Sequence, residues 1–275
     1  MKKSMVCAAV AATLACATFA SCSKKDIAKQ CEMVKIPGRN FELMNTEVTQ
    51  KFYKEVMGEL PDLLTGLTRE GGLREEIGDD IPVFNICWYD AICFCNKMSE
   101  KYGYEPVYSV NGTTDVSEWG WTLYNIDGKE LSLKVVWNKK ANGFRLPTNE
   151  EWEYAAIAGE NFLYPGSDDI SKVAWINDNS EGKMHPVAKK KPNAFGLFDM
   201  LGNVDEPVWW DDLGVVIACT RIGEYQCVRR GRNFETPGYA IKKGEWKKID
   251  GDDVGFNYLG VDTNGLRLAR TVMEN

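Results

Sequence analysis

Histidine is nearly absent from this sequence, which has one such residue among 275. A metal centre built from several imidazoles therefore cannot form. A cysteine–histidine or serine–histidine catalytic pair would have to use His185 as its base. His185 precedes Pro186 in a segment that we expect to be a loop. The composition leaves little room for histidine-dependent chemistry.

An excess of basic residues and a long apolar segment are also missing. The chain has 33 Lys and Arg against 40 Asp and Glu, a formal net charge of −7, which argues against nucleic acid as a partner. No segment after residue 21 is apolar enough to cross a bilayer, which takes roughly 20 apolar residues. Aromatic residues and 25 glycines without low-complexity stretches predict a compact, loop-rich protein.

The N-terminus carries the features of an export signal. Lys2 and Lys3 precede a short apolar run over residues 5–20, which is typical of a secretory signal peptide. The run ends at Ser21-Cys22 in a sequence similar to a bacterial lipobox. We therefore expect residues 1–21 to be the signal peptide, Cys22 to carry lipid and residues 22–31 to form a tether. The protein would then be an exported lipoprotein, anchored by that lipid at the outer membrane or cell surface. The alternative is ordinary signal cleavage beside an incidental cysteine.

Six of the nine cysteines lie beyond Cys22. Cys93 and Cys95 fall two positions apart on an expected helix, so their side chains point to nearly opposite sides and cannot form a disulfide. Cys219 and Cys227 flank a segment centred on Gly223 that reads as a hairpin. These two could form a disulfide in an exported protein, or they could be two small buried apolar residues.

Local signals predict three helices and several short strands. Thr49 and Gly58 mark the two ends of one helix, while Thr148 and Glu151 form a capping box for another. From residue 162 onward there is no strong helical periodicity. The expected elements are a strand at 32–37, a helix at 49–58, a loop at 59–80, a helix at 88–102, β structure at 107–137 with a turn at 126–129, and a helix at 148–159. We expect residues 32–275 to form a single α+β domain.

Four groups of short motifs are specific when they are taken together in order. They are residues 33–38 with 47–50, residues 82–96, residues 143–156, and residues 192–204 followed by 265–268. In this order they resemble the formylglycine-generating-enzyme, or sulfatase-modifying-factor, family. The resemblance implies a C-type lectin-like fold with a twisted β core, a few helices and long ordered loops. These motifs contain Trp88, Arg145 and Trp152. We expect the two tryptophans to pack in the core and Arg145 to fix the connection between a strand and a helix.

The sequence departs from this family where the family's oxidase places two cysteines. These cysteines follow a strand that corresponds here to residues 229–234, and this chain has Thr236 and Ile241 at their positions. Neither side chain can form a thiolate, ligate copper or form a disulfide. The ergothioneine-type relatives use a histidine-rich iron site, which one histidine cannot supply. We therefore expect a protein that is not an enzyme and needs no cofactor.

A second departure lies after Gly202-Asn203-Val204, where family members commonly have Trp at the positions of Asp205 and Pro207. This replacement resembles the variable proteins of diversity-generating retroelements, several of which are lipoproteins. The resemblance implies a diversified ligand-binding region at residues 205–262 and a variant-specific protein or cell-surface ligand. The candidate ligand-binding residues are Asp205, Pro207, Trp209, Trp210, Tyr225, Arg232, Phe234, Thr236, Pro237, Tyr239, Phe256, Asn257 and Tyr258, and further diversified candidates are Asn233, Gly238 and Leu259.

The resemblance also implies a structural calcium site. Carried over by position, it would consist of the side chains of Asp199 and Glu206 with the carbonyls of Gly202 and Val204. Oxygen ligands with two carboxylates suit Ca²⁺. The alternative is that the two acidic side chains cap turns.

Two classes of function follow from these observations. One is a binding module whose aromatic and charged C-terminal residues form a recognition surface, because large rigid rings give contact area at low entropic cost. The other is an enzyme of the same family with unfamiliar chemistry. Its support is limited to acidic clusters at 211–212 and 250–253, which are more simply solvated loop charges.

Overall fold

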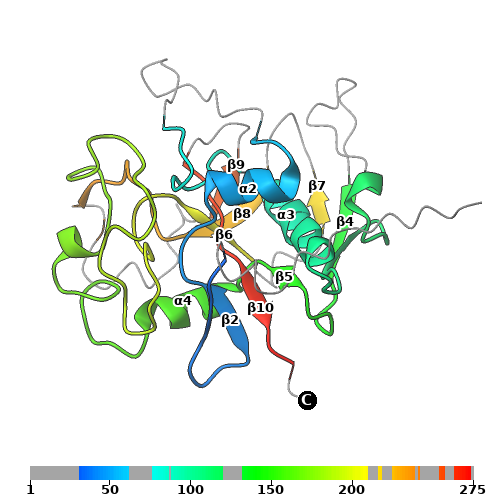
Figure 1. The fold of residues 1–275 in the computed structure, drawn as a ribbon, viewed down its shortest axis with the longest axis horizontal. Coiled ribbons are helices and arrows are strands. Elements are labelled where there is room, and N and C mark those ends of the chain that lie inside the picture. Colours follow the sequence, from blue (N-terminus) through cyan, green and yellow to red (C-terminus); the bar gives the residue numbers. More distant parts are fainter. Residues whose placement is uncertain are drawn as a thin grey trace, which may run out of the picture.

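The computed structural model describes residues 31–61, 76–86, 88–119, 132–209, 216–218, 225–238, 241, 254–257 and 263–273 of the chain. Its elements are β1 (Met33–Lys35), β2 (Phe41–Met44), α2 (Gln50–Met57), α3 (Trp88–Lys101), β3 (Tyr108–Val110), β4 (Ser132–Trp137), β5 (Phe144–Arg145), α4 (Asn149–Ile157), β6 (Glu206–Val208), β7 (Val216–Ala218), β8 (Tyr225–Arg230), β9 (Val254–Asn257) and β10 (Ala269–Thr271), with 3-10 turns at Val116–Glu118 and Ile170–Lys172 (Figure 1). Long irregular segments separate these short elements, as expected for a loop-rich α+β protein. No helix in the described residues is both long and apolar enough to cross a bilayer.

A four-stranded antiparallel sheet joins the two ends of the domain. Its strand order is β1-β2-β10-β5, so β10 near the C-terminus lies between two strands from much earlier in the chain. Figure 1 shows β10 beside β2 at the lower edge of the molecule. This pairing brings residues 263–268, which lead into β10, against the N-terminal part of the fold.

The remaining strands form two further sheets, with orders β3-β4-β7 and β6-β8-β9. β8 pairs with β6 through Val228–Arg230 and with β9 through Tyr225–Val228, whereas β7 pairs with β4. The hairpin expected between Cys219 and Cys227 is not seen as a pairing of β7 with β8, and its turn at 219–224 lies outside the described residues. Cys227 lies opposite Gly255 of β9, and Cys219 falls outside the described residues.

The three expected helices are confirmed as α2, α3 and α4. Thr49 accepts a hydrogen bond from the N–H of Phe52 at the start of α2, and Gly58 ends this helix in the left-handed region. The capping box at α4 forms as expected between Thr148 and Glu151. The left-handed C-cap of α4 is residue 158, one position before the expected glycine.

Arg145 fixes the joint between β5 and α4. Its guanidinium donates to both carboxylate oxygens of Glu151 at 2.6 and 2.8 Å, and its Nε donates to Thr271 of β10. The side chain is almost fully buried. The expected scaffold role of Arg145 is thus confirmed by contacts that link β5, α4 and β10.

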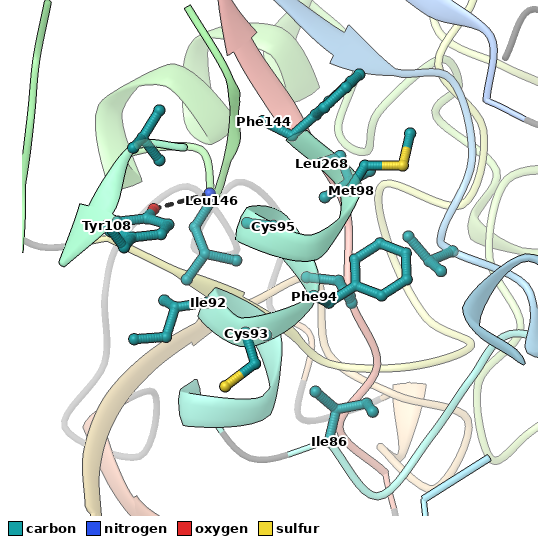
Figure 2. Packing of buried hydrophobic residues seen from close by; sticks show 14 of the residues in the cluster. Ile86, Ile92, Cys93, Phe94, Cys95, Met98, Tyr108, Phe144, Leu146 and Leu268 are labelled. Atoms are coloured by element: carbon teal, nitrogen blue, oxygen red, sulfur yellow. Dashed lines mark hydrogen bonds between the residues drawn. The ribbon is translucent and has the colours of Figure 1, made fainter. Parts of the chain in front are cut away.

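Two large apolar clusters fill the interior. The first surrounds α3, where Phe94 and Met98 pack inward and the hydroxyl of Tyr108 accepts a hydrogen bond from the N–H of Leu146 (Figure 2). Cys93 and Cys95 are buried free cysteines in this cluster, and burial raises the pKa of both thiols. The second cluster surrounds Trp152 of α4.

Candidate functional site

A turn at residues 201–206 lies between the two apolar clusters and is held by buried polar contacts. Glu206 at the start of β6 and Arg267 ahead of β10 both have 0% of their side chains exposed. The Nε of Arg267 lies 2.9 Å from both carboxylate oxygens of Glu206, and its Nη2 lies 2.7 Å from Oε1. This buried ion pair links the turn to the segment that leads into β10 of the four-stranded sheet.

Both partners of this ion pair make further hydrogen bonds. Trp152 of α4 donates its indole N–H to Oε2 of Glu206 at 2.6 Å. Arg267 donates to the backbone carbonyls of Met44 and Phe198 at 2.9 and 2.8 Å. Removing two charges from water costs several kcal/mol for each ion, and such close, multiple hydrogen bonds are what repay that cost. The pair is therefore fully engaged within the protein.

A second acidic side chain, Glu47, supports the turn from the N-terminal part of the chain. Its two oxygens accept hydrogen bonds from the side-chain amide of Asn203 at 2.7 Å and from the N–H of Val204 at 3.1 Å. Gly202 has φ 81°, and a Cβ there would overlap the backbone of Trp175. Only glycine fits this position, so the conformation of the turn is set by its sequence.

Asp199 lies just before the turn and is also buried. It adopts φ 54°, and its Oδ2 accepts the N–H of Ala188 at 2.7 Å. Burial raises the pKa of the Asp199 carboxyl to about 6. Burial, followed by the charges of Asp199 and Glu206, raises the pKa of Glu47 well above its ordinary value. The region thus holds three buried acidic groups beside one guanidinium.

The contacts around the expected calcium site leave it a prediction. Both oxygens of Glu206 are bonded to Arg267, and one also accepts the indole N–H of Trp152, so this carboxylate is already engaged within the protein. The buried Oδ1 of Asp199, by contrast, has no hydrogen-bond partner in the described part of the chain. Within the described residues, no group of three or more His, Cys, Asp or Glu side chains is arranged to hold a metal ion, but the expected site has only two such side chains, Asp199 and Glu206, beside the carbonyls of Gly202 and Val204.

Sequence reasoning did not identify Glu47 and Arg267 as partners in this network. Both lie inside the motifs that carry the family resemblance, yet they are separated by more than two hundred positions in the chain. Asp199 and Glu206 were expected nearby, and they are. A pattern in a single sequence does not reveal a contact across such a separation.

Four of the candidate ligand-binding side chains are buried. Trp209, 7% exposed, stacks on Tyr108 and contacts the ring of Trp88. Asp205 accepts hydrogen bonds from Asn233 at 2.7 Å and from the hydroxyl of Thr263 at 3.1 Å. This burial argues against direct contact of these side chains with a ligand, because β6 is buried along its whole length and Phe234 packs in a separate apolar cluster. The four buried candidates are Asp205, Pro207, Trp209 and Phe234.

The other candidates whose side chains are described lie on one loop, residues 231–238, which follows β8. Phe234 is fully buried against Phe84, Met184 and Val204 and anchors the loop from beneath. Its N–H donates to the carbonyl of Asn203 at 3.0 Å, and its own carbonyl accepts from Ser180 at 2.9 Å. The loop is thus held rigidly on the 201–206 turn.

Side chains on both sides of Phe234 reach the surface of this loop. The partly exposed residues of the 231–238 loop are Gly231, Arg232, Asn233, Glu235, Thr236, Pro237 and Gly238. The N–H of Asn177 donates to the carbonyl of Thr236, and the N–H of Gly238 donates to Asp178. The loop therefore combines a fixed backbone with half-exposed side chains, which is the arrangement that a preorganised binding loop requires.

Other expected site residues cannot be placed by their side chains. Tyr225 lies on β8, and Phe256 and Asn257 lie on β9. The expected positions outside the described residues are Cys22, Trp210, Tyr239, Tyr258 and Leu259, together with the acidic clusters at 211–212 and 250–253. Their roles stay predictions.

The two positions of the family's catalytic cysteines are described in full. Thr236 accepts the N–H of Asn233 through its hydroxyl, and Ile241 is buried in the cluster around Trp152. The cysteines with described side chains, which are Cys31, Cys93 and Cys95, belong to the other apolar cluster. In this part of the chain, the place of the oxidase thiols is thus occupied by a hydroxyl and an aliphatic side chain.

The sequence is similar to those of a known protein family and of several characterised proteins. Residues 17–270 match the sulfatase-modifying factor enzyme 1-like domain. The chain is 35% identical over 195 residues to "Chaperone protein LppX" of Paenibacillus barcinonensis, and the match covers 62% of each protein. A shorter stretch of 78 residues is 37% identical to the formylglycine-generating enzyme of Mycobacterium tuberculosis and covers 26% of that enzyme. The chain thus spans less than two thirds of the length of these relatives.

Solved structures show the same fold. "Treponema denticola variable protein 1" superposes with a TM-score of 0.61 and 28% identity, and the match covers 87% of this chain and 91% of that one. The structure of CarF superposes with a TM-score of 0.60 at 24% identity, over 85% and 87% of the two chains. These matches confirm the expected α+β fold of the formylglycine-generating-enzyme type and the resemblance to variable proteins.

Proposed function

Because this chain belongs to the family of sulfatase-modifying factor enzyme 1-like domains, we propose that it uses the family's fold as a ligand-binding scaffold rather than as an oxidase. The observation that carries this proposal is the pair Thr236 and Ile241 at the positions of the family's two catalytic cysteines. A hydroxyl and a buried alkyl group cannot bind copper or exchange disulfides.

The proposed binding surface includes fewer residues than were expected from the sequence. The similarity to Treponema denticola variable protein 1 supports a diversified C-terminal region on a constant scaffold. The burial of Asp205, Pro207, Trp209 and Phe234 assigns these residues to the scaffold. The partly exposed positions Arg232, Thr236 and Pro237 remain as recognition residues on the 231–238 loop, and the expected residues of β8 and β9 would complete the surface.

The proposed setting is the cell envelope. The Ser21-Cys22 junction after a short apolar run supports export and lipid attachment. A lipid anchor would hold the domain at the outer membrane or cell surface, where a variant-specific protein or cell-surface ligand would be met. The acidic composition supports a partner other than nucleic acid.

An oxidation assay separates the scaffold from an enzyme. Purified protein is incubated with copper, oxygen and a Cys-x-Pro-x-Arg peptide, and conversion of the peptide cysteine is followed by mass spectrometry. The proposal predicts no conversion above a copper-only control. Turnover that depends on the protein would establish the alternative, an enzyme of this family with chemistry that does not use the two cysteines.

A genomic comparison tests the diversification itself. The 3′ end of the gene, which encodes residues 205–262, is compared with the surrounding genome and between individual cells. The proposal predicts a nearby near-copy that differs mainly at adenines, with substitutions at the codons of half-exposed residues such as Arg232 and Thr236. A region without any near-copy and without variation between cells would contradict it.

A second candidate function follows from the relative that is named a chaperone. Its 35% identity over 195 residues supports a role in holding an unfolded protein, which is also a binding function without catalysis. Light scattering of reduced, aggregating lysozyme distinguishes the two. A holding chaperone would suppress the scattering at stoichiometric amounts, whereas a variant-specific binder would leave it unchanged.

A further inference from the structure

The chain contains three asparagine residues that are followed directly by glycine. In such a pair the backbone nitrogen of glycine can attack the side-chain carbonyl carbon of asparagine, and the missing Cβ of glycine leaves that approach unhindered. This reaction is one reason why asparagine counts among the thermolabile residues. The surroundings of each pair in the fold decide whether it can react. The three pairs are Asn111-Gly112, Asn142-Gly143 and Asn264-Gly265.

Asn111 and Gly112 form the exposed tip of a tight turn directly after β3. Val110 and Thr113 exchange backbone hydrogen bonds of 2.9 and 3.1 Å across this turn. The φ angles of Asn111 and Gly112 are 51° and 92°. Positive φ at both central residues is the mark of a type I′ turn, for which Asn-Gly is the preferred sequence. A Cβ on Gly112 would meet no atom of the described residues within 4 Å, so this tip has room to move.

This turn can reach the reactive conformation while the hairpin stays closed. In a type I′ turn the ψ angle of the first central residue is about 30°, which directs the nitrogen of Gly112 away from the Asn111 side chain. Rotation of the peptide group between the two residues gives a type II′ turn, in which that ψ angle is about −120°. The nitrogen of Gly112 then lies on the same side as Cβ of Asn111, within reach of its side-chain carbonyl carbon. Glycine accepts the change in the sign of φ, and both turn types close a two-residue hairpin.

We propose that Asn111 is a site of spontaneous deamidation, which is reached by this rotation of the exposed turn. The nitrogen of Gly112 gives its proton to a base in the solvent and forms a bond with Cγ of Asn111. The bond between Cγ and Nδ2 breaks, and Nδ2 takes up a proton and leaves as ammonia. One water molecule then opens the succinimide ring at either of its two carbonyl groups. The products are aspartate and isoaspartate, and nothing is oxidised or reduced.

The modification changes both the charge and the backbone of the turn. Either product adds one negative charge beside Thr113, whose hydroxyl already donates to Glu118 at 2.9 Å. Isoaspartate also places an additional carbon atom in the backbone, so the two-residue connection between Val110 and Thr113 becomes longer. The site lies outside residues 205–262, and the inference is independent of any ligand.

The second pair is held in place by its neighbours. The Oδ1 atom of Asn142 accepts the N–H of Glu105 at 3.0 Å. Gly143 is buried, and a Cβ on it would overlap the carbonyl oxygen of Glu105 and the hydroxyl of Ser99. Rotation of the peptide group here would break that hydrogen bond and displace packed backbone. We therefore expect Asn142 to react much more slowly than Asn111.

The third pair lies in the interior. Asn264 is 2% exposed, and the N–H of Gly265 donates to the carbonyl of Asp205 at 2.7 Å. A Cβ on Gly265 would overlap the side chain of Val204. The attacking nitrogen is thus engaged in a buried hydrogen bond. Asn264 can react only when this part of the domain unfolds.

The test compares deamidation in the folded full chain with deamidation in the chain unfolded by guanidinium chloride. Both samples are kept in the same mildly alkaline buffer, and the three peptides are quantified over time by mass spectrometry. Because glycine follows each asparagine, the unfolded chain supplies a reference rate for every pair. Folding should slow the reaction of Asn111 by less than about tenfold and should slow those of Asn142 and Asn264 by far more. Equal protection of Asn111 and Asn264 would overturn the proposal.

The products and a variant test the route and the assignment. Chromatography should separate aspartate and isoaspartate forms of the Asn111 peptide, because ring opening gives both. Aspartate alone would indicate direct hydrolysis of the amide and would contradict cyclisation. The control variant is Asn111→Gly, since glycine also adopts the positive φ of this position. The acidic form of the folded protein that develops on ion exchange should be missing in this variant, and its persistence would overturn the assignment to Asn111.

Discussion

At the scale of single residues, we expect the loss of the contact between Glu206 and Arg267 to lower the stability of the domain more than the loss of a surface ion pair. Both side chains are fully buried, and together they connect α4, β6, the end of β2 and the segment that leads into β10. A buried pair of this kind adds little relative to a well-packed apolar pair, but removing one partner leaves the other charged and buried.

Glu206→Gln should therefore destabilise the domain strongly. The free energy of unfolding should fall by about 3–5 kcal/mol, as is typical when one partner of a buried ion pair is removed. The matched control is Glu42→Gln, which breaks the partly exposed pair with Arg270 and should cost about 1 kcal/mol or less. Urea unfolding curves measure both. Equal losses would show that the buried network has no special role.

The pKa values of the buried acids give stability a defined pH dependence. Burial raises the pKa of Asp199 to about 6 and raises that of Glu47, so the folded protein holds protons that the unfolded chain releases. The contribution of Asp199 to stability is complete below the unfolded pKa and is lost as pH rises through about 6. Unfolding midpoints in urea should therefore fall between pH 5 and pH 8.

The control for this pH dependence is again Asp199→Asn, which cannot titrate at that position. Its unfolding midpoint should change less between the two pH values than that of the wild-type chain. A wild-type midpoint that rises with pH, with the same slope in the variant, would contradict this reading of the buried acids.

At the scale of elements, the helices follow from local sequence and the strand pairing does not. Thr49, Gly58 and the Thr148–Glu151 capping box act within one turn of the chain, and each forms as expected. The partners of β8 lie about twenty-five residues away on either side, and in the described residues β8 does not pair with the neighbouring β7. Likewise β6 is buried along its whole length, so its sequence has no alternation of apolar and polar residues that would distinguish a core-facing side from a surface-facing side.

Within α4, Trp152 and Thr148 should contribute very different amounts. Trp152 is buried in the second apolar cluster and donates to Glu206, so Trp152→Ala should cost about 3–5 kcal/mol and leave little folded protein. Thr148→Ala removes one cap and should cost about 0.5–2 kcal/mol. Circular dichroism during urea unfolding measures both. Similar losses in the two variants would show that α4 is held by its cap and not by its packing.

At the scale of the whole molecule, the N-terminal and C-terminal parts of the domain meet in one sheet. β2 pairs with β10, and the turn at 201–206 lies against both through Glu47 and Arg267. The family motifs therefore map onto the scaffold, as the sequence indicated. The binding surface could not be located equally well, because a single sequence does not distinguish a buried aromatic residue such as Trp209 from an exposed one.

Attachment to the membrane is a property of the whole chain. If Cys22 carries lipid, Cys22→Ala should move the protein from the membrane fraction to the soluble fraction and reduce its mass by the acyl groups. Several acyl chains hold a protein stably, whereas one holds it only marginally. The control is Cys31→Ala, which changes the next cysteine along the chain; it was expected at the end of the tether but is buried in the apolar cluster around α3. Membrane association and mass that are unchanged in Cys22→Ala would contradict the lipoprotein assignment.

The most direct test of the scaffold proposal compares two displayed libraries. One randomises the partly exposed loop positions Arg232, Glu235, Thr236 and Pro237, and the other randomises the buried positions Asp205, Trp209 and Phe234. The measurement is the fraction of protease-resistant members, followed by selection of the resistant ones for binding to lysozyme. Substitutions outside the core usually change stability by about 0.5 kcal/mol or less, whereas large buried side chains cost several times more. Most of the loop library should stay folded and yield binders, and most of the interior library should unfold. A loop library that unfolds as often as the interior library, or stays folded and yields no binder, would contradict the account.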